Sequence, residues 1–247
     1  MWSIFNRKSQ PYDLSWMEVD MHSHILPGLD DGCANTAESM KILSHLADLN
    51  LKQLYFTPHV FKEMYPNTVS HIERAFAQLS IGEFAGFLGG YAAEYMVDNH
   101  FEQLLKAEEK LLTLPTNLIL IEMSYAQEYN QIERMIFDLL IEGYNPILAH
   151  PERYKFYHGN VNQIRRLREI GCLLQVNLLS VTGYYGMHEK RMAKYLASEG
   201  LVDLVGTDIH HERHVMALEH SLRREDLYRY FKKCNLINQE IFHKLNQ

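Results

Sequence analysis

Apolar and β-branched residues form short runs that recur along the chain. Between them, other segments repeat apolar residues every three or four positions, which places these residues on one face of a helix. The expected strands are residues 17–21, 53–57, 83–89, 118–123, 146–149, 173–177 and 201–206, and the expected helices are residues 37–49, 69–79, 131–140, 161–170 and 189–198. Repeated strand and helix units with short connections predict parallel strands, in a closed β/α barrel or an open doubly wound sheet.

Side-chain types that bind metals follow the ends of nearly all these strands. In β/α barrels the active site is assembled at the carboxyl ends of several strands, whereas an open sheet uses only the ends beside its switch point. So many strand ends with metal-binding side chains favour an α/β fold of the seven-stranded, barrel-like kind. The residues at these ends are His22, His24, His59, Glu94, Glu122, His150, Asp208 and His210.

The composition predicts one soluble domain that comprises residues 1–247. Of the 247 residues, 47% are hydrophobic, no apolar run is long enough to span a bilayer, and no linker or repeat divides the chain. Residues 1–16 are expected to be an N-terminal arm packed on the domain, with a contact to a membrane surface or a partner as the alternative. The arm lacks the apolar core and cleavage site of a secretory signal, so we expect a cytoplasmic protein without membrane insertion.

The charge and the cysteines argue against several classes of protein. A net charge of -7 without a basic cluster argues against nucleic acid as a partner. The three cysteines, Cys33, Cys172 and Cys234, lack a CxxC spacing and are expected to be free thiols. A cysteine-dependent tyrosine phosphatase needs an arginine at a fixed distance after its nucleophile, and those positions hold Ser39, Leu178 and Glu240. Covalent cysteine catalysis is therefore disfavoured.

The first predicted strand leads into a His-Ser-His sequence. Alternation along a strand places His22 and His24 on one face, where both imidazoles can share one cation. Asp20 lies on the same face and is expected to orient an imidazole N–H instead of binding metal. In the turn that follows, either Asp30 or Asp31 could reach a cation, and the alternative is that both only make turn contacts and cap the next helix.

The number of candidate ligands indicates more than one cation. The strand-end residues and one of the two aspartates make nine, whereas a hydrolytic metal usually takes about three to five protein ligands. We therefore expect three divalent ions, and imidazole and carboxylate ligands without cysteine suit Mn²⁺, Fe, Zn²⁺ or Mg²⁺. Such a site favours a phosphate dianion, which Arg153 would bind through its planar guanidinium. These residues indicate a metal-dependent phosphoesterase.

Several blocks of the sequence together form a recognisable pattern. They are DMHSHILPGLDDG at residues 20–32, TPH at 57–59, AHPERY at 149–154 and GTDIH at 206–210, with Glu94 and Glu122 at two further strand ends. This pattern resembles the polymerase and histidinol phosphatase (PHP) superfamily, and more narrowly its bacterial capsule and exopolysaccharide branch of manganese-dependent protein tyrosine phosphatases. The resemblance implies a distorted seven-stranded (β/α) barrel of the TIM-like PHP fold with three Mn²⁺ ions. It also implies the removal of phosphate from tyrosines in the tail of a bacterial tyrosine kinase that controls polysaccharide export.

The resemblance further implies roles for individual residues. Arg153 would bind the phosphate and, with Asp208 and His210, would make up the catalytic group. Arg213 is a shifted candidate for a second substrate-binding arginine. The implied metal ligands are His22, His24, Glu94, Glu122, His150 and Asp208 for a metal pair, and Asp31, His59 and His210 for the third ion.

Other functions stay open at this point. The same metal centre would serve histidinol phosphate or another small phosphomonoester, because substrate choice depends on the loops. An amidohydrolase-like or nuclease barrel can also begin with HxH, but the dispersed His59 and His210 argue against it. A non-catalytic module that binds metal or docks on the kinase is the alternative of another class.

Four further histidines and two tyrosines are not expected to bind metal. His45 and His71 are expected on helix faces, and His211 and His214 near the site without binding metal. Tyr184 and Tyr185 either line the mouth of the site or simply pack.

Overall fold

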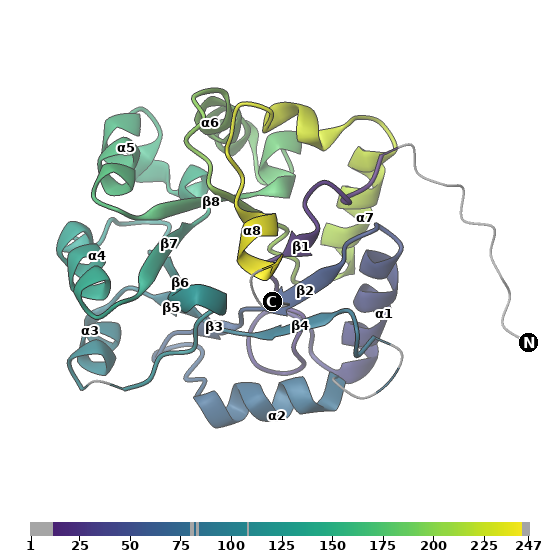
Figure 1. Ribbon diagram of the computed structural model, residues 1–247, viewed down its shortest axis with the longest axis horizontal. Coiled ribbons are helices and arrows are strands. Elements are labelled where there is room, and N and C mark those ends of the chain that lie inside the picture. Colours follow the sequence, from purple (N-terminus) through teal and green to yellow (C-terminus); the bar gives the residue numbers. More distant parts are fainter. Residues whose placement is uncertain (1–11, 80–81, 83, 108, 244–247) are drawn as a thin grey trace, which may run out of the picture.

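Strands and helices alternate along the chain, as the sequence pattern predicts (Figure 1). A computed structural model describes residues 12–79, 82, 84–107 and 109–243, so most of the expected N-terminal arm, residues 1–16, lies outside the described residues. The strands are β1 (Val19–Asp20), β2 (Gln53–Phe56), β3 (His59–Val60), β4 (Leu88–Tyr91), β5 (Glu94–Met96), β6 (Leu118–Glu122), β7 (Asn145–Ala149), β8 (Leu173–Asn177) and β9 (Leu204–Gly206).

The strands form two sheets, and all the strand pairs within them are parallel. One sheet has the order β1-β2-β4, and the other has the order β3-β5-β6-β7-β8-β9. The prediction of parallel β/α units is therefore confirmed. The predicted closed seven-stranded barrel is not confirmed, because the hydrogen-bonded ladders divide into two sheets. A parallel bridge between Ser23 and Ile209 nevertheless links the segments that follow β1 and β9.

Near the second and third predicted strands, the described residues form four short strands instead of two. Residues 57–58 separate β2 from β3, where Pro58 lacks the N–H that a continuous strand would use. The expected strand at 83–89 is wrong in its position, since β4 begins at Leu88 and β5 at Glu94. At Gly89 in β4, a Cβ would lie 2.2 Å from the ring of Tyr55, so glycine permits this close approach of strand and ring.

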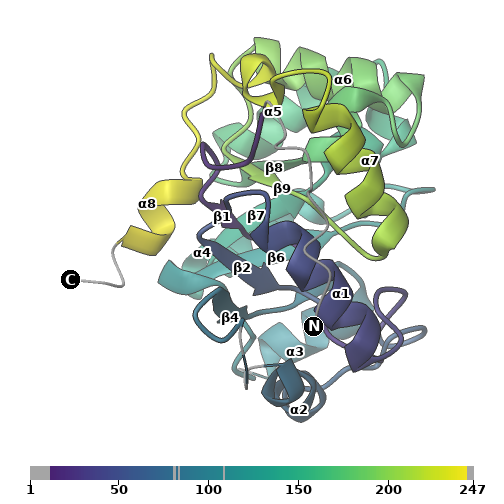
Figure 2. The same cartoon turned by 90° about the vertical axis from the view of Figure 1, so that its right-hand side faces the viewer.

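Helices surround the strands on the outside of the molecule (Figures 1 and 2). The predicted helix at 69–79 matches α2, and four others match within two residues or so at each end, while α3, α7 and α8 were not predicted. The helices are α1 (Thr36–Ala47), α2 (Val69–Leu79), α3 (Asn99–Lys106), α4 (Ile132–Ile141), α5 (Val161–Glu169), α6 (Met187–Ser198), α7 (Glu212–Leu222) and α8 (Asn238–His243). Among the described residues, no helix is both long and apolar enough to cross a bilayer.

The two faces of the strands bury different apolar clusters. On β6, Ile119 and Ile121 belong to the large cluster shared with the helices, whereas Leu118 and Leu120 belong to a smaller one. The smaller cluster also contains Met21 from the segment after β1 and residues of β2, β7 and β9, so both sheets contribute to it. Because both faces of β6 are buried, its sequence is a continuous apolar run instead of an alternating one.

The two ends of the strands are occupied differently. Asn238, at the start of α8, donates to the carbonyl oxygens of Val19 and Val205 and accepts from the Val205 N–H, which ties β1 to β9. His22 and Asp208 follow later on the same two segments. The opposite, carboxyl end of the strands therefore remains available for the candidate site.

Candidate metal centre

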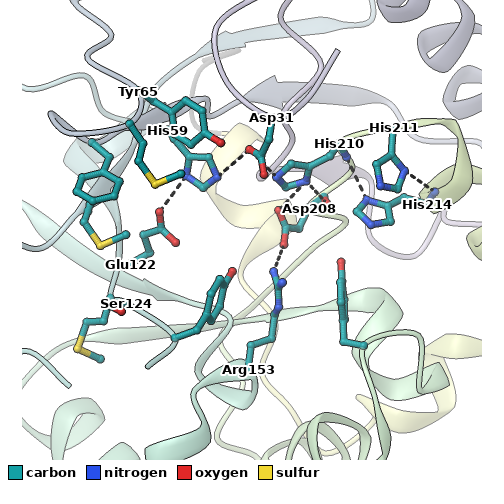
Figure 3. A pocket seen from close by; sticks show the side chains of 16 residues that line it. Asp31, His59, Tyr65, Glu122, Ser124, Arg153, Asp208, His210, His211 and His214 are labelled. Atoms are coloured by element: carbon teal, nitrogen blue, oxygen red, sulfur yellow. Dashed lines mark hydrogen bonds and ion pairs between the residues drawn. The ribbon is translucent and has the colours of Figure 1, made fainter. Parts of the chain in front are cut away.

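A cavity of about 440 Å³ opens at the carboxyl ends of the strands (Figure 3). One wall carries imidazoles and carboxylates, and the rest is largely aromatic or contains methionine. Its lining residues are Asp31, His59, Phe61, Met64, Tyr65, Met96, Glu122, Met123, Ser124, Tyr125, Arg153, Tyr185, Asp208, His210, His211 and His214.

The structure brings all nine predicted ligands together. Their side chains make up four overlapping groups, and within each group the potential ligand atoms lie within 4.8 Å of one another. The groups are His24, Asp31, His59 and His210; His22, His150 and Asp208; His22, His24 and Glu94; and His59, Glu94 and Glu122. His24 thus lies close to both sets of ligands that the resemblance implies.

His22 and His24 point toward the same two carboxylates. Their Nε2 atoms are 3.1 Å apart, each lies 3.3 Å from Oε2 of Glu94, and each lies 3.4 Å from Oδ1 of Asp208. Glu94 Oε2 is buried and has no hydrogen-bond partner among the described residues. A buried carboxylate oxygen without a donor, surrounded by imidazole nitrogens, fits a divalent cation.

The second part of the cluster is closer to solvent. Nδ1 of His59 lies 2.9 Å from Oε1 of Glu122, and its Nε2 lies 3.5 Å from Oδ1 of Asp31. The same Asp31 oxygen is 3.6 Å from Nε2 of His210, and 55% of the Asp31 side chain is exposed (Figure 3). An exposed carboxylate beside two imidazoles leaves room for solvent at this position.

The two adjacent aspartates have different roles. Oδ2 of Asp30 accepts from Nδ1 of His24 at 2.8 Å and from the backbone N–H of His59 at 3.0 Å, so Asp30 orients the His24 ring. Asp31 alone faces the cluster. The expectation that Asp20 orients an imidazole is wrong, because its carboxylate accepts from the backbone N–H groups of His22 and Thr207 and from the Thr207 hydroxyl.

His150 and Asp208 are held in a left-handed backbone conformation, with φ of 36° and 52°. This conformation is costly for residues with a Cβ and is concentrated at functional sites. His150 comes directly before Pro151 and the short 3-10 helix Pro151–Arg153, and its Nε2 lies 3.0 Å from Oε1 of Glu94. The sharp turn after β7 thus places His150 and Arg153 on the same side of the cavity.

Arg153 is clamped at the cavity wall. Its Nη1 donates to Oδ2 of Asp208 at 2.9 Å, and its guanidinium lies 4.6 Å from the ring centroid of Tyr125 and 4.3 Å from that of Tyr185. Tyr125 was not predicted as a site residue, because no motif marks an isolated tyrosine after a strand. Of the two predicted alternatives for the Tyr184–Tyr185 pair, lining the site holds for Tyr185, which lines the cavity. Tyr184 is not among the lining residues and packs edge-on against Tyr185.

The buried charges of the cluster stabilise one another. Burial alone would raise the pKa of Glu94, but the imidazoles of His22 and His59 hold it well below its ordinary value. Burial and the neighbouring His59 lower the pKa of His24, yet Asp30 and Glu94 together raise it to about 10. Without a cation, protons on imidazoles therefore balance the ionised carboxylates, and a divalent ion would replace those protons.

The remaining candidates lie around this cluster or away from it. Arg213 is exposed on α7 and does not line the cavity, so the structure does not bring it to the site. His211 caps α7, and His214 accepts from the backbone N–H of His210. On helix faces outside the site, His45 pairs with Glu219 at 2.8 Å, and His71 is exposed.

The fold and the site together define a protein of the parallel β/α class whose histidine and carboxylate clusters are able to bind metal. The chain belongs to the family described as capsular polysaccharide synthesis, CpsB/CapC, which matches residues 18–221. This membership confirms the resemblance that the sequence blocks indicated.

Characterised relatives of this chain are tyrosine phosphatases. It is 29% identical over 195 residues to the tyrosine-protein phosphatase YwqE of Bacillus subtilis, covering 78% of this chain and 77% of YwqE. It is 31% identical over 201 residues to the tyrosine-protein phosphatase CpsB of Streptococcus pneumoniae, covering 78% and 82%. A chain from the crystal structures of YwqE and CpsB, described as metal-dependent tyrosine phosphatases, matches with a TM-score of 0.74 and 26% identity, covering 88% of this chain and 96% of that one.

Proposed function

We propose that this protein is a metal-dependent protein tyrosine phosphatase whose active site is the cavity at the carboxyl ends of the strands. The observation that carries the proposal is the convergence of nine imidazole and carboxylate side chains beside the clamped Arg153. The names of its relatives support the same activity. The metal cluster would bind the phosphate together with Arg153, which supplies a planar, permanently charged donor.

The proposal includes three divalent ions, with Mn²⁺ as the preferred metal. The donor groups support more than one ion, because their nine side chains exceed the roughly three to five protein ligands that a hydrolytic metal usually takes. When bound, such ions neutralise phosphate charge and lower the pKa of bound water toward about 7. Asp30 keeps the Nε2 lone pair of His24 directed at the cluster by accepting its Nδ1 proton.

The apolar wall of the cavity supports an aromatic substrate. Phe61, Met64 and Tyr65 come from the turn after β3, and Met96 ends β5 on the same cavity. A phenyl ring would bury apolar area against these side chains while its phosphate reached the metal cluster. The preferred substrate would therefore be phosphotyrosine in a protein segment, with the tail of a bacterial tyrosine kinase that controls capsule or exopolysaccharide synthesis as the proposed partner. A cytoplasmic location stays a prediction.

We also propose that the two sheets together make the distorted seven-stranded barrel that the resemblance implies. The Ser23–Ile209 bridge and the apolar cluster shared by both sheets support this closure. A closed arrangement would explain why ligands from strands at both ends of the sheets reach one cavity.

The activity is tested on the 247-residue protein loaded with Mn²⁺. We expect kcat/KM on a phosphotyrosine peptide to exceed kcat/KM on histidinol phosphate. The reverse preference would make the protein a small-molecule phosphomonoesterase. Full metal loading without turnover of either substrate would instead support the non-catalytic docking module.

A further inference from the structure

The strand β8 supplies no candidate metal ligand, although its carboxyl end reaches the cluster. It carries two amide side chains there, Gln175 and Asn177, and both are completely buried. A buried amide is costly unless its polar atoms are paired. The partners of these two amides therefore indicate what they do.

The two amides form an unbroken chain of hydrogen bonds between candidate ligands. Oε1 of Gln175 accepts from Nδ1 of His22 at 2.9 Å and from the backbone N–H of His150 at 3.4 Å. Nε2 of Gln175 donates to Oδ1 of Asn177 at 2.9 Å, and Nδ2 of Asn177 donates to Oδ2 of Asp208 at 2.5 Å. The chain thus connects His22 to Asp208 through side chains of β8.

The direction of this chain is fixed from both ends. The backbone N–H of His150 can only donate, so the oxygen of Gln175 must face it, and Nδ1 of His22 must then be the protonated nitrogen. An ionised Asp208 can only accept, which sets the amide of Asn177 in the matching orientation. The His150 N–H and the Asp208 carboxylate together therefore set how both amides are oriented. The same contacts also determine that Nδ1 of His22 carries a proton.

At both ends of this series of hydrogen bonds, one atom of a candidate ligand is left to face the cluster. Because Nδ1 keeps its proton, Nε2 is the His22 nitrogen left for a cation, and it lies 3.1 Å from His24 Nε2 and 3.4 Å from Asp208 Oδ1. Oδ2 of Asp208 is occupied by Asn177 and Arg153, so Oδ1 is the oxygen left for a cation. The hydrogen bonds thus leave Nε2 of His22 and Oδ1 of Asp208 facing the cluster.

We propose that Gln175 and Asn177 are positioning residues that act as one unit to set the tautomer of His22 and the orientation of Asp208 for metal binding. This inference rests on the proposed function in that it takes His22 and Asp208 as metal ligands. Groups that orient metal ligands in this way typically contribute about 10- to 100-fold to metal affinity.

The test compares Gln175→Glu with Asn177→Asp. The hydrogen bonds need an acceptor toward His22 at position 175 and a donor toward Asp208 at position 177, and a carboxylate can only accept. Mn²⁺ affinity is measured on the 247-residue protein by competition with a chelator. Gln175→Glu keeps an acceptor for His22 and should retain more affinity than Gln175→Leu, which should lose roughly 10- to 100-fold. Asn177→Asp places a carboxylate against Asp208 and should lose at least as much affinity as Asn177→Leu.

Two further measurements separate positioning from space filling. If the amides act as one unit, the Gln175→Leu/Asn177→Leu double variant should cost less affinity than the sum of the single variants. In Zn²⁺-loaded protein, NMR should detect a hydrogen-bonded Nδ1 proton on His22 in the wild type and in Gln175→Glu. In Gln175→Leu, the chemical shift of this proton should move away from the value typical of a hydrogen-bonded imidazole N–H.

Asn238→Leu is the matched control, since it removes another buried amide that joins β1 to β9 away from the cluster. It should lower Tm and leave Mn²⁺ affinity unchanged. Three results would overturn the proposal. They are equal losses of Mn²⁺ affinity in Gln175→Glu and Asn177→Asp, wild-type affinity in Gln175→Leu, and a loss in Asn238→Leu as large as that in Gln175→Leu. None of these readouts needs a substrate, so a protein that binds metal normally and hydrolyses no phosphotyrosine contradicts the proposed function alone.

Discussion

Arg153 donates to Oδ2 of Asp208 across 2.9 Å, which joins the predicted phosphate-binding residue directly to a predicted metal ligand. Only 22% of the Arg153 side chain is exposed, and the rings of Tyr125 and Tyr185 lie on either side of its guanidinium. The group is therefore held in place before a phosphate arrives, which reduces the entropic cost of binding.

Replacing Arg153 should separate phosphate recognition from metal binding. Arg153→Ala removes a charge-assisted contact worth about 1.5 to 3 kcal/mol, so kcat/KM on a phosphotyrosine peptide should fall roughly 10- to 150-fold. Arg153→Lys should recover only part of this, because it keeps the charge without the planar fork. Metal content should be retained, since Asn177 still holds Asp208. Loss of metal in step with activity would contradict this assignment and make Arg153 a support of the cluster.

The ring of Tyr125 should matter through its contact with Arg153. Tyr125→Leu removes the aromatic face 4.6 Å from the guanidinium, a contact worth about 0.5 to 2 kcal/mol, so kcat/KM should fall roughly 2- to 30-fold. Tyr125→Phe keeps the ring and serves as the control with near wild-type kinetics. If steady-state kinetics showed Phe to be as damaging as Leu, the hydroxyl group and not the ring would be the important feature.

Metal dependence should be complete and should depend on the ligand cluster. Removal of metal with a strong chelator should abolish phosphatase activity, and Mn²⁺ should restore it. His22→Ala or His150→Ala should lower metal content and turnover together. His71→Ala, at an exposed position of α2, is the control and should change neither. Full activity in a verified metal-free sample would rule out the mechanism.

Metal binding should become tighter as pH rises. The pKa of His24 is raised to about 10 in the metal-free protein, because Asp30 and Glu94 outweigh its burial and the neighbouring His59. His24 is therefore protonated at pH 7 and must lose its proton to bind a cation. Calorimetry in buffers of different ionisation enthalpy should detect proton release on Mn²⁺ binding. No proton release between pH 7 and 8 would show that His24 is already neutral.

The same shift predicts how the stability of the metal-free protein depends on pH. A raised pKa in the folded state contributes stability that is fully present below the unfolded value of about 6.5 and is lost as pH rises toward 10. Denaturant unfolding of the metal-free protein should therefore show a lower free energy of unfolding at pH 9.5 than at pH 6.5. His24→Gln cannot titrate and should reduce this difference.

Thiol reagents should leave the activity nearly unchanged. Cys33, Cys172 and Cys234 are free, and burial raises the pKa of Cys33 to about 11 and that of Cys172 to about 12. At pH 8 both are protonated and poorly nucleophilic. Alkylation followed by mass spectrometry and activity assays checks this. A loss of activity that follows modification of one cysteine, with metals retained, would argue for a catalytic thiol.

Local patterns in the sequence determined most of the secondary structure and the candidate ligands. The expected strand at 173–177 and helix at 69–79 match β8 and α2, because apolar periodicity reflects neighbouring residues on one element. His22 and His24 were predictable for the same reason, since alternation along one strand places both on one face. The position of the third strand was not predictable from apolar residues alone, because β4 contains Gly89 and Gly90, which contribute no apolar side chain and lie against Tyr55 of β2.

Only the tertiary structure decided how those ligands are oriented. Gln175 sets the proton position of His22 from 153 residues away in the sequence, and Tyr125 and Tyr185 hold Arg153 from different loops. The structure also leaves Arg213, the shifted candidate that the family resemblance suggested, outside the cavity. Such contacts join distant segments whose residues carry no shared periodicity, so the amino-acid sequence names the donors, and the packing of strands and loops determines which atom of each donor faces the site.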